Sequence, residues 1–200
     1  MTVEVFNPLD KLALAESVES KLLEQAPVLL SNTGAVKGAG LYALYYDGSF
    51  PAYSKIAAKD KFDPLKPPIY VGKAIPKGGR KGGLGKDVAN STALKSRLDK
   101  HAQSIAQSTN LKLNDFFFRH LVVDDVWIPL GENMLIENFR PLWNIVVDGF
   151  GNNDPGKGRY NQKRSSWDVL HPGRSWTVNI TGGQKFGIDQ IEEKITNHLS

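Results

Sequence analysis

The chain has 200 residues, 40% of them apolar, which suits one globular domain with a packed core. It contains no cysteine, so disulfide bonds and thiolate metal sites are excluded. No apolar run approaches membrane-spanning length and the N-terminus lacks a signal-peptide pattern, so we expect a cytoplasmic protein. The net charge of +4 is unevenly placed: residues 73–97 carry seven Lys and Arg against one Asp, which indicates a polyanionic partner.

An N-terminal helix is expected over residues 8–26, in an acidic part of the chain. Asn7 can cap this helix, Pro8 suits its first turn, and apolar residues recur at near-helical spacing. The sequence leaves two roles open for it: a helix packed on the flank of the core, or an element of a dimer interface.

Two strands are expected at residues 40–47 and 69–72, both bounded by Gly, Pro or Asp-Gly. Antiparallel pairing of the two would bring Tyr42 and Tyr70 within reach of each other. A strand tyrosine usually packs in the core. Each of these two, however, lies two residues from a glycine, and a glycine in a strand often marks close approach of a ligand.

The segment 73–90 is dense in glycine and in basic residues. Glycine lets the backbone run close to another molecule, and Lys and Arg can neutralise phosphates or read guanine edges. We expect a loop that is solvated in the free protein and orders on DNA, because cations at phosphates release counterions. The DNA-contacting residues expected here are Lys73, Lys77, Arg80, Lys81 and Lys86.

A helix is expected over residues 91–107. It carries Arg97 and His101 four residues apart, hence on one face. A strand dense in Phe and Val follows at residues 115–123, and we expect it to be the central or third strand of the sheet, with His120 in a structural role.

A further helix is expected over residues 129–139. Its apolar residues would pack on the sheet, and Glu132, three to four residues before Leu135 and Ile136, can face the same way. An inward carboxylate at a helix start needs a reason, and a metal ion is one. The other acid of this helix, Glu137, lies on another face and is expected to be solvated.

A second candidate DNA surface lies at residues 148–166, which are rich in Gly, Asn and basic residues. A structured loop at residues 167–176 and an amphipathic helix at residues 189–199 follow. For His171 and Arg174 the sequence leaves DNA contact and packing both open. The DNA-contacting set predicted from this part of the chain is Arg159, Lys163, Arg164 and Arg174.

The order of these features resembles the GIY-YIG nucleases over residues 38–147. That family has a Gly-x-Tyr strand, a Tyr-x-Gly strand, a helix with Arg and then Tyr or His four residues on, a Glu on a later helix, and an Asn after it. Here the strands read Gly-Leu-Tyr and Tyr-Val-Gly, and the Asn ends a Pro-x-aromatic-Asn run. The link at residues 73–90 is longer than is usual in the family. The implied catalytic residues are Tyr42, Tyr70, Arg97, His101, Glu132 and Asn144.

The resemblance implies one Mg²⁺ (or Mn²⁺) per active site, held by Glu132, the scissile phosphate and waters. One carboxylate cannot build a two-metal site, and Mg²⁺ keeps much of its hydration. Tyr42 would deprotonate or orient the attacking water, with the neutral imidazole of His101 placed to take the phenolic proton. Arg97 would hold a phosphoryl oxygen, Tyr70 would position the phosphate or the water, and Asn144 would fix the site geometry.

The expected fold is α+β: a GIY-YIG-like core with a three-stranded antiparallel sheet flanked by helices. We divide the chain into an N-terminal helical extension (1–37), the nuclease core (38–147) and C-terminal DNA-contacting loops with a helix (148–200). The chain has no room for a separate DNA-binding domain, which favours a type II restriction endonuclease over a repair or homing-type nuclease. A non-cleaving DNA-binding protein on the same scaffold is the other alternative.

The resemblance is closest to the GIY-YIG restriction enzymes that cut GC-rich palindromes. It implies double-stranded DNA as the substrate and products with 5′-phosphate and 3′-hydroxyl ends. A homodimer is expected, because two-fold symmetry matches a palindrome most simply.

Overall fold

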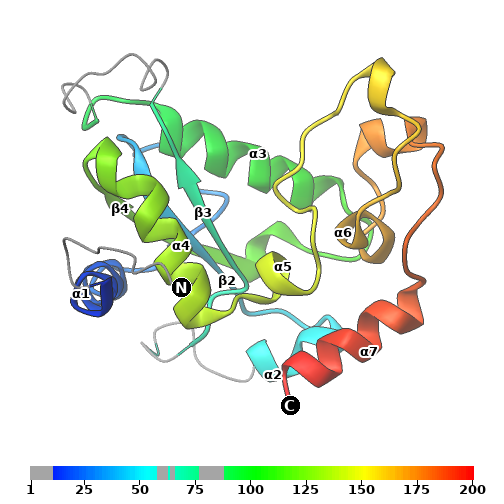
Figure 1. Ribbon diagram of the computed structural model, residues 1–200, viewed down its shortest axis with the longest axis horizontal. Coiled ribbons are helices and arrows are strands. Elements are labelled where there is room, and N and C mark those ends of the chain that lie inside the picture. Colours follow the sequence, from blue (N-terminus) through cyan, green and yellow to red (C-terminus); the bar gives the residue numbers. More distant parts are fainter. Residues whose placement is uncertain (1–10, 58–62, 64–65, 77–87) are drawn as a thin grey trace, which may run out of the picture.

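The computed structural model describes residues 11–57, 63, 66–76 and 88–200. At its centre lies a four-stranded sheet of order β1-β4-β2-β3, in which all neighbours are antiparallel. The strands are β1 (Val28–Leu29), β2 (Gly40–Tyr46), β3 (Tyr70–Ala74) and β4 (Phe116–Val122). The α+β fold is therefore as expected, and β4 lies inside the sheet between β1 and β2. Figure 1 labels the three longer strands β2, β3 and β4. The strand that was not predicted is β1, which is only two residues long.

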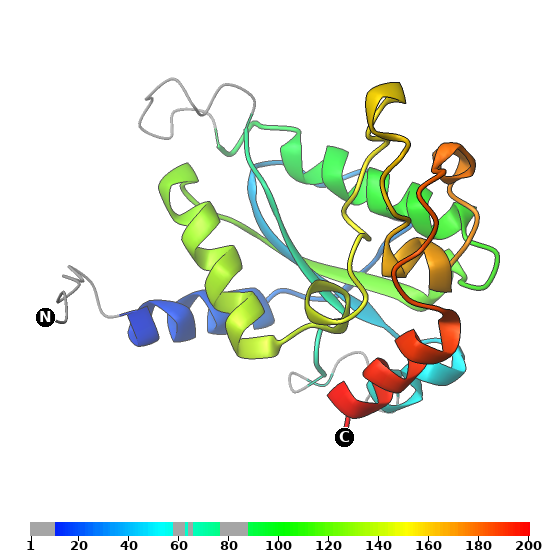
Figure 2. The same cartoon turned by 45° about the vertical axis from the view of Figure 1, so that its right-hand side comes forward.

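Helices cover both faces of this sheet. Because side chains alternate along a strand, Tyr42, Leu44 and Tyr46 of β2 enter the larger core cluster and the residues between them enter a second one. The larger cluster includes side chains of α3 (Ala93–Gln107), α5 (Leu142–Ile145) and α6 (Ser166–Leu170). The second includes side chains of α1 (Lys11–Leu23) and α4 (Ile128–Phe139). Figure 2 shows α3 on one side of the sheet and α4 on the other.

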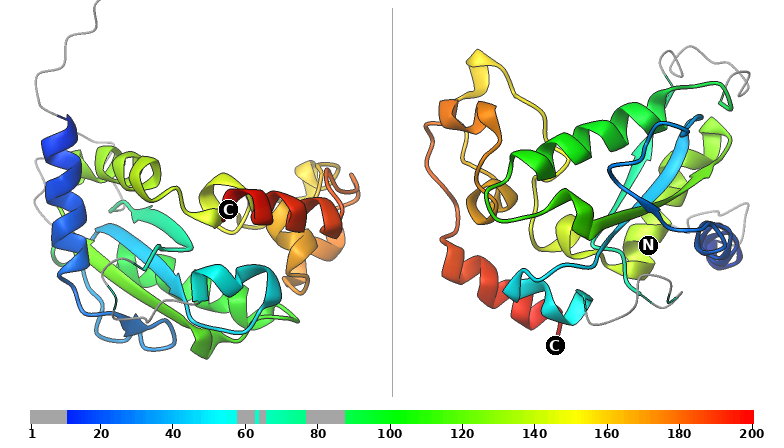
Figure 3. Two further views of the ribbon diagram at one scale, coloured as in Figure 1. Left: turned by 90° about the horizontal axis from the view of Figure 1, so that it is seen from below. Right: turned by 180° about the vertical axis from the view of Figure 1, so that it is seen from behind.

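The C-terminal helix α7 (Ile188–His198) and α1 lie at opposite ends of the molecule (Figure 3). Ile191 and Ile195 of α7 nevertheless belong to the same core cluster as Tyr42. The predicted boundary between residues 147 and 148 stays a proposal. It would divide the sequence into segments that share one hydrophobic core. The remaining short helices are α2 (Ser54–Ala57) and 3₁₀ turns at Pro51–Tyr53, Leu113–Asp115, Asp125–Trp127, Lys157–Arg159 and Ser175–Asn179.

The predicted helices occur within two or three residues of their expected ends in the described ranges. Thr92 is the N-cap residue of α3, but its side chain forms no capping hydrogen bond. The neighbouring Ser91 supplies one instead, since its Oγ accepts from the Ala93 amide at 3.2 Å. In α1, Leu22 is fully buried and packs in the cluster shared with α4. This supports the packed-flank role of α1 and leaves its dimer role a prediction. None of the helices in the described ranges is long and apolar enough to cross a membrane.

Candidate active site

The two signature glycines are required for different reasons. Gly40 opens β2 with φ +154°, and a Cβ there would lie 2.0 Å from the Leu121 carbonyl oxygen on β4. A Cβ on Gly72 would lie 2.4 Å from the Tyr42 hydroxyl. Real Cβ contacts essentially never fall below 3.0 Å. Gly40 therefore permits the strand pairing, whereas Gly72 leaves space for the hydroxyl of Tyr42.

That hydroxyl is hydrogen-bonded to His101. The Tyr42 Oη and His101 Nε2 atoms lie 2.6 Å apart, and both side chains are buried. Tyr42 pairs with Gly72 and Leu44 pairs with Tyr70, so the two tyrosines lie diagonally across β2 and β3 with ring centroids 6.3 Å apart. The Tyr70 ring centroid is 5.2 Å from that of His101. The two strands and α3 thus converge on one buried cluster, as predicted.

Burial sets the protonation states of this cluster. It raises the pKa of Tyr42 and of Tyr70, and it lowers the pKa of His101 well below its ordinary value, an effect to which the nearby Arg97 charge adds. Phenol and imidazole are therefore both neutral near pH 7. The second ring nitrogen of His101, Nδ1, is buried and has no hydrogen-bond partner in the described part of the chain.

Glu132 approaches the same cluster from α4. Burial is the main cause that raises the pKa of Tyr42 and of Tyr70, and the negative charge of Glu132 is a smaller cause. The carboxylate therefore lies within electrostatic range of both phenols. Its Oε2 lies 2.5 Å from Nζ of Lys73. Lys73, which the sequence assigned to the DNA-contacting loop, is thus an active-site neighbour paired with the proposed metal ligand.

Asn144 holds the outer edge of β3. Its Oδ1 accepts from the Val71 amide at 2.8 Å, and its Nδ2 donates to the Val71 carbonyl at 2.9 Å. Because β3 is an edge strand, these two backbone groups would otherwise lack a partner. Asn144 therefore positions Tyr70 through the backbone next to it, and its expected role in fixing the geometry of the active site stays a prediction.

Sequence reasoning missed Phe150. Its ring is stacked on the His101 imidazole, with centroids 4.5 Å apart and an angle of 18° between the planes, and lies edge-on to Tyr70. The next residue, Gly151, leaves so little room that a Cβ there would lie 2.8 Å from the Tyr70 hydroxyl. The signal that could have revealed this loop is the Gly-Phe-Gly run at residues 149–151.

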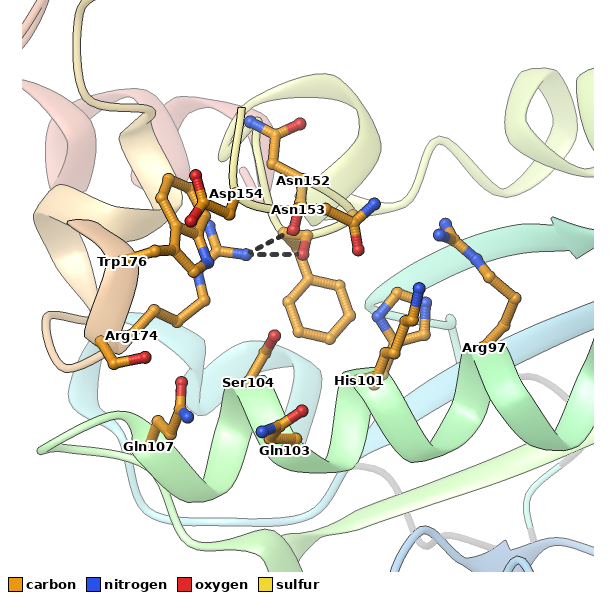
Figure 4. A pocket seen from close by; sticks show the side chains of 14 residues that line it. Arg97, His101, Gln103, Ser104, Gln107, Asn152, Asn153, Asp154, Arg174 and Trp176 are labelled. Atoms are coloured by element: carbon orange, nitrogen blue, oxygen red, sulfur yellow. Dashed lines mark hydrogen bonds between the residues drawn. The ribbon is translucent and has the colours of Figure 1, made fainter. Parts of the chain in front are cut away.

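Arg174 holds that loop in place, which favours its packing alternative over the predicted contact with DNA. Its side chain is only 1% exposed. Nε donates to the Asp168 carboxylate at 2.6 Å, and the two terminal nitrogens donate to the carbonyls of Gly149, Phe150 and Asn152. Figure 4 draws the bonds to Phe150 and Asn152 as dashed lines. These bonds occupy the guanidinium inside the protein, so its role is to position the loop that carries Phe150.

His171 follows its packing alternative. Its Nδ1 lies 2.8 Å from Oδ1 of Asn110, an atom that only accepts, so Nδ1 carries the hydrogen and Nε2 accepts from the Tyr53 hydroxyl at 2.5 Å. Tyr53 also accepts from Trp143 Nε1 at 2.9 Å. This second buried tyrosine–histidine pair ties the C-terminal segment to the core.

The remaining predicted DNA contacts divide into three groups. Lys77, Arg80, Lys81 and Lys86 lie outside the described residues. Arg159 and Lys163 are exposed on the C-terminal loop, and they stay candidates for DNA contact. Arg164 is half-buried, and its Nη2 donates to the Thr177 carbonyl at 3.2 Å, which commits part of its guanidinium to the fold.

The residues suited to a metal are few. Among the described residues no group of three or more His, Asp and Glu side chains could enclose a metal ion. Glu132 alone fits a cation that keeps most of its waters and takes further oxygens from a phosphate. Arg97, which lies within electrostatic range of Glu132, offers a guanidinium whose Nε is buried without a hydrogen-bond partner in the described ranges.

Comparison with known proteins agrees with this geometry. The family model described as the Eco29kI GIY-YIG domain matches residues 34–199. A search of curated proteins finds no match. The family match spans most of the chain and includes every residue of the cluster around Tyr42 and His101. The chain therefore belongs to the Eco29kI GIY-YIG domain family of restriction endonucleases, and it is a nuclease.

Proposed function

We propose that this nuclease is a type II restriction endonuclease that cuts double-stranded DNA at a specific, GC-rich palindromic site. The observation that carries the chemistry is the buried 2.6 Å contact between Tyr42 and His101, with Arg97 and Glu132 beside it. Phosphodiester hydrolysis needs an activated water and charge stabilisation on the phosphoryl oxygens. The cluster holds a proton acceptor, a guanidinium and a carboxylate for these tasks.

In the proposed proton step, Tyr42 takes a proton from the attacking water as its own proton passes to His101 Nε2. Burial raises the pKa of Tyr42, so a free phenolate is disfavoured and the two transfers must be coupled. Burial also lowers the pKa of His101, which keeps its lone pair available at neutral pH. For Nε2 to accept, Nδ1 must carry the ring hydrogen.

The other residues orient the phosphate. Arg97 can donate a charge-assisted fork to a phosphoryl oxygen. Tyr70 lies between Tyr42 and Phe150, where its hydroxyl can position the phosphate or the water. Asn144 acts indirectly, because it bonds only to the backbone of Val71.

GIY-YIG nucleases generally use a divalent metal, and we propose Mg²⁺, which Mn²⁺ can replace. Glu132 would hold it together with a phosphate oxygen and waters. When bound, the ion would neutralise charge that develops on the phosphate. Because Lys73 now pairs with the Glu132 carboxylate, a cation must compete with its ammonium group.

The finer features of the proposed reaction rest on the family relationship and on charge. Arg and Lys suit the edges of guanine, which supports a GC-rich site. A palindrome is matched most simply by a two-fold homodimer. We propose 5′-phosphate and 3′-hydroxyl ends as the products.

The test is a plasmid digest with Mg²⁺ or Mn²⁺, followed by sequencing of the ends. Discrete bands that share one palindromic sequence support a restriction enzyme. Nicking or a smear favours a repair or homing-type nuclease, and retardation without cutting favours a binding protein.

The Glu132→Gln variant separates metal chemistry from DNA binding. We expect it to lose cleavage and retain DNA binding, because the amide replaces the only carboxylate proposed as a metal ligand. Glu137→Gln is the matched control, since Glu137 lies on the same helix and is exposed. Cleavage by Glu132→Gln at the control's rate would overturn the metal role.

A further inference from the structure

A polar cavity of about 170 Å³ extends from the catalytic cluster along α3 (Figure 4). Arg97 and His101 line its first end and Gln107 its far end, while the loop at residues 150–154 and Trp176 lie opposite the helix. The chemistry proposed above uses only the first end. The rest of the cavity therefore has no role in the cleavage step itself.

The net charge of this cavity is positive. Lys100 lies three residues after Arg97 on α3, and neither side chain forms a salt bridge in the described part of the chain. Like charges at this spacing destabilise a helix. By contrast, Lys95 of the same helix is paired with Asp99 at 2.6 Å. Two adjacent unpaired cations facing one cavity indicate an anionic ligand.

The other ionisable groups of the cavity offset only part of this charge, because the single negative charge of Asp154 stands against the two positive charges of Arg97 and Lys100. Arg174 is neutralised by Asp168. The two carboxylate oxygens of Asp154 are turned into their own loop, where they accept from the Gly156 amide and the Tyr160 hydroxyl. Burial lowers the pKa of His101, so the imidazole is neutral.

Size and spacing narrow the class of ligand. Pockets that enclose a small molecule measure roughly 300–1,000 Å³, so this cavity is too small to enclose an extrahelical nucleotide. Lys100 lies about 4.5 Å beyond Arg97 along the helix axis. Phosphates of one DNA strand are spaced about 3.4 Å along the duplex axis. Both spacings are a few ångströms, so two cations about one helical turn apart can each contact one of two neighbouring phosphates.

We propose that this cavity binds the sugar–phosphate unit next to the scissile phosphate, with Lys100 on the neighbouring phosphate. Gln103 and Asn153 line the same space and supply amide donors for that unit. The inference rests on the proposed function, because the scissile phosphate sets the register. Since phosphate contacts carry no sequence information, Lys100 strengthens binding without selecting the site.

The experiment is a thermodynamic cycle in which a substitution in the protein and a neutral linkage in the DNA are made singly and together. The probe is a duplex oligonucleotide carrying the mapped cleavage site, with one methylphosphonate on either side of the scissile phosphate in separate arms. Affinity is measured in the Glu132→Gln background, which keeps the DNA intact. Lys100→Ala is compared with Lys95→Ala, a matched control on the same helix.

We expect the neutral linkage on one side to weaken binding by the parent protein about tenfold, as for loss of a charge-assisted hydrogen bond. The same linkage should have no further effect on Lys100→Ala and a full effect on Lys95→Ala. Equal losses in both variants, or none in the parent protein, would overturn the proposal.

A second measurement does not depend on cleavage. On any duplex, Lys100→Ala should reduce the slope of log affinity against log salt by about 0.9, and an unchanged slope would also overturn the proposal. Failure of the proposed function is seen separately, as absence of discrete plasmid bands.

Discussion

Replacing Gly72 by Ala tests whether Tyr42 must occupy its observed position. The new Cβ would lie 2.4 Å from the Tyr42 hydroxyl oxygen and 2.6 Å from Cζ of its ring, whereas ordinary contacts begin at 3.4 Å. The hydroxyl must therefore move by about 1 Å. Such a movement would disturb the hydrogen bond to His101 and the packing around the ring, because Tyr42 is fully buried and bonded to His101.

A displacement of about 1 Å at a catalytic group typically costs about 100-fold in rate. We expect kcat for plasmid cleavage to fall by that factor, equivalent to about 2.7 kcal/mol in the activation free energy. The added methyl group also overpacks the core, at about 1–3 kcal/mol of stability. Thermal unfolding and DNA binding are therefore measured beside the cleavage rate, so that unfolded protein is not mistaken for slow chemistry.

Gly34→Ala is the control, since a Cβ there meets no atom within 4 Å. A further variant tests the route of the effect. Tyr42→Phe should itself be nearly inactive, and adding Gly72→Ala to it should change the rate little, because both changes act on the same hydroxyl. A folded Gly72→Ala protein that cleaves within threefold of the wild-type rate would refute the argument.

Two further predictions concern pH. Burial lowers the pKa of His101 and raises that of Tyr42. In a pH–rate profile, kcat should therefore fall on the acid side with a midpoint below pH 6.5, and ionisation of the Tyr42 phenol should cause no loss up to pH 10. A midpoint at or above pH 6.5 for the fall on the acid side would contradict this. Burial also lowers the pKa of His171 to about 3, so below pH 6.5 the unfolded chain binds a proton that the folded chain does not. The stability that this pKa difference supplies is fully present above pH 6.5 and falls by about 1.4 kcal/mol per pH unit below it. In denaturant titrations, the unfolding free energy of His171→Gln should therefore fall less steeply on acidification than that of the control His198→Gln.

The parts of the site that local pattern determines were predictable. Arg97 and His101 share a face because four residues make about one helical turn, and α3 has the predicted extent. Tyr42 and Tyr70 were expected on paired strands, and the observed register puts them diagonally opposite. The sheet was also expected, apart from β1, whose two residues are too short to show an alternating pattern.

Arg174 and Phe150 could not be predicted in the same way. Arginine is almost never fully buried unless it is paired, so a solvent-facing role was the reasonable expectation. Its burial depends on Asp168 and on three carbonyls of a loop more than twenty residues earlier in the chain. The stack of Phe150 on His101 exists only because that loop crosses α3, a contact that no local periodicity encodes.

The proposed active site is assembled from both faces of the sheet, at its edge. Gly72 lies on the face that carries Tyr42 and α3, while Lys73 pairs in register with Leu41, on the face covered by α4 and Glu132. The two groups can act on one phosphate only where the sheet ends, and β3 is its edge strand. The hydrogen bonds from Asn144 to Val71 hold that edge. They therefore set the position of the phenols relative to the carboxylate, without requiring Asn144 to touch the substrate.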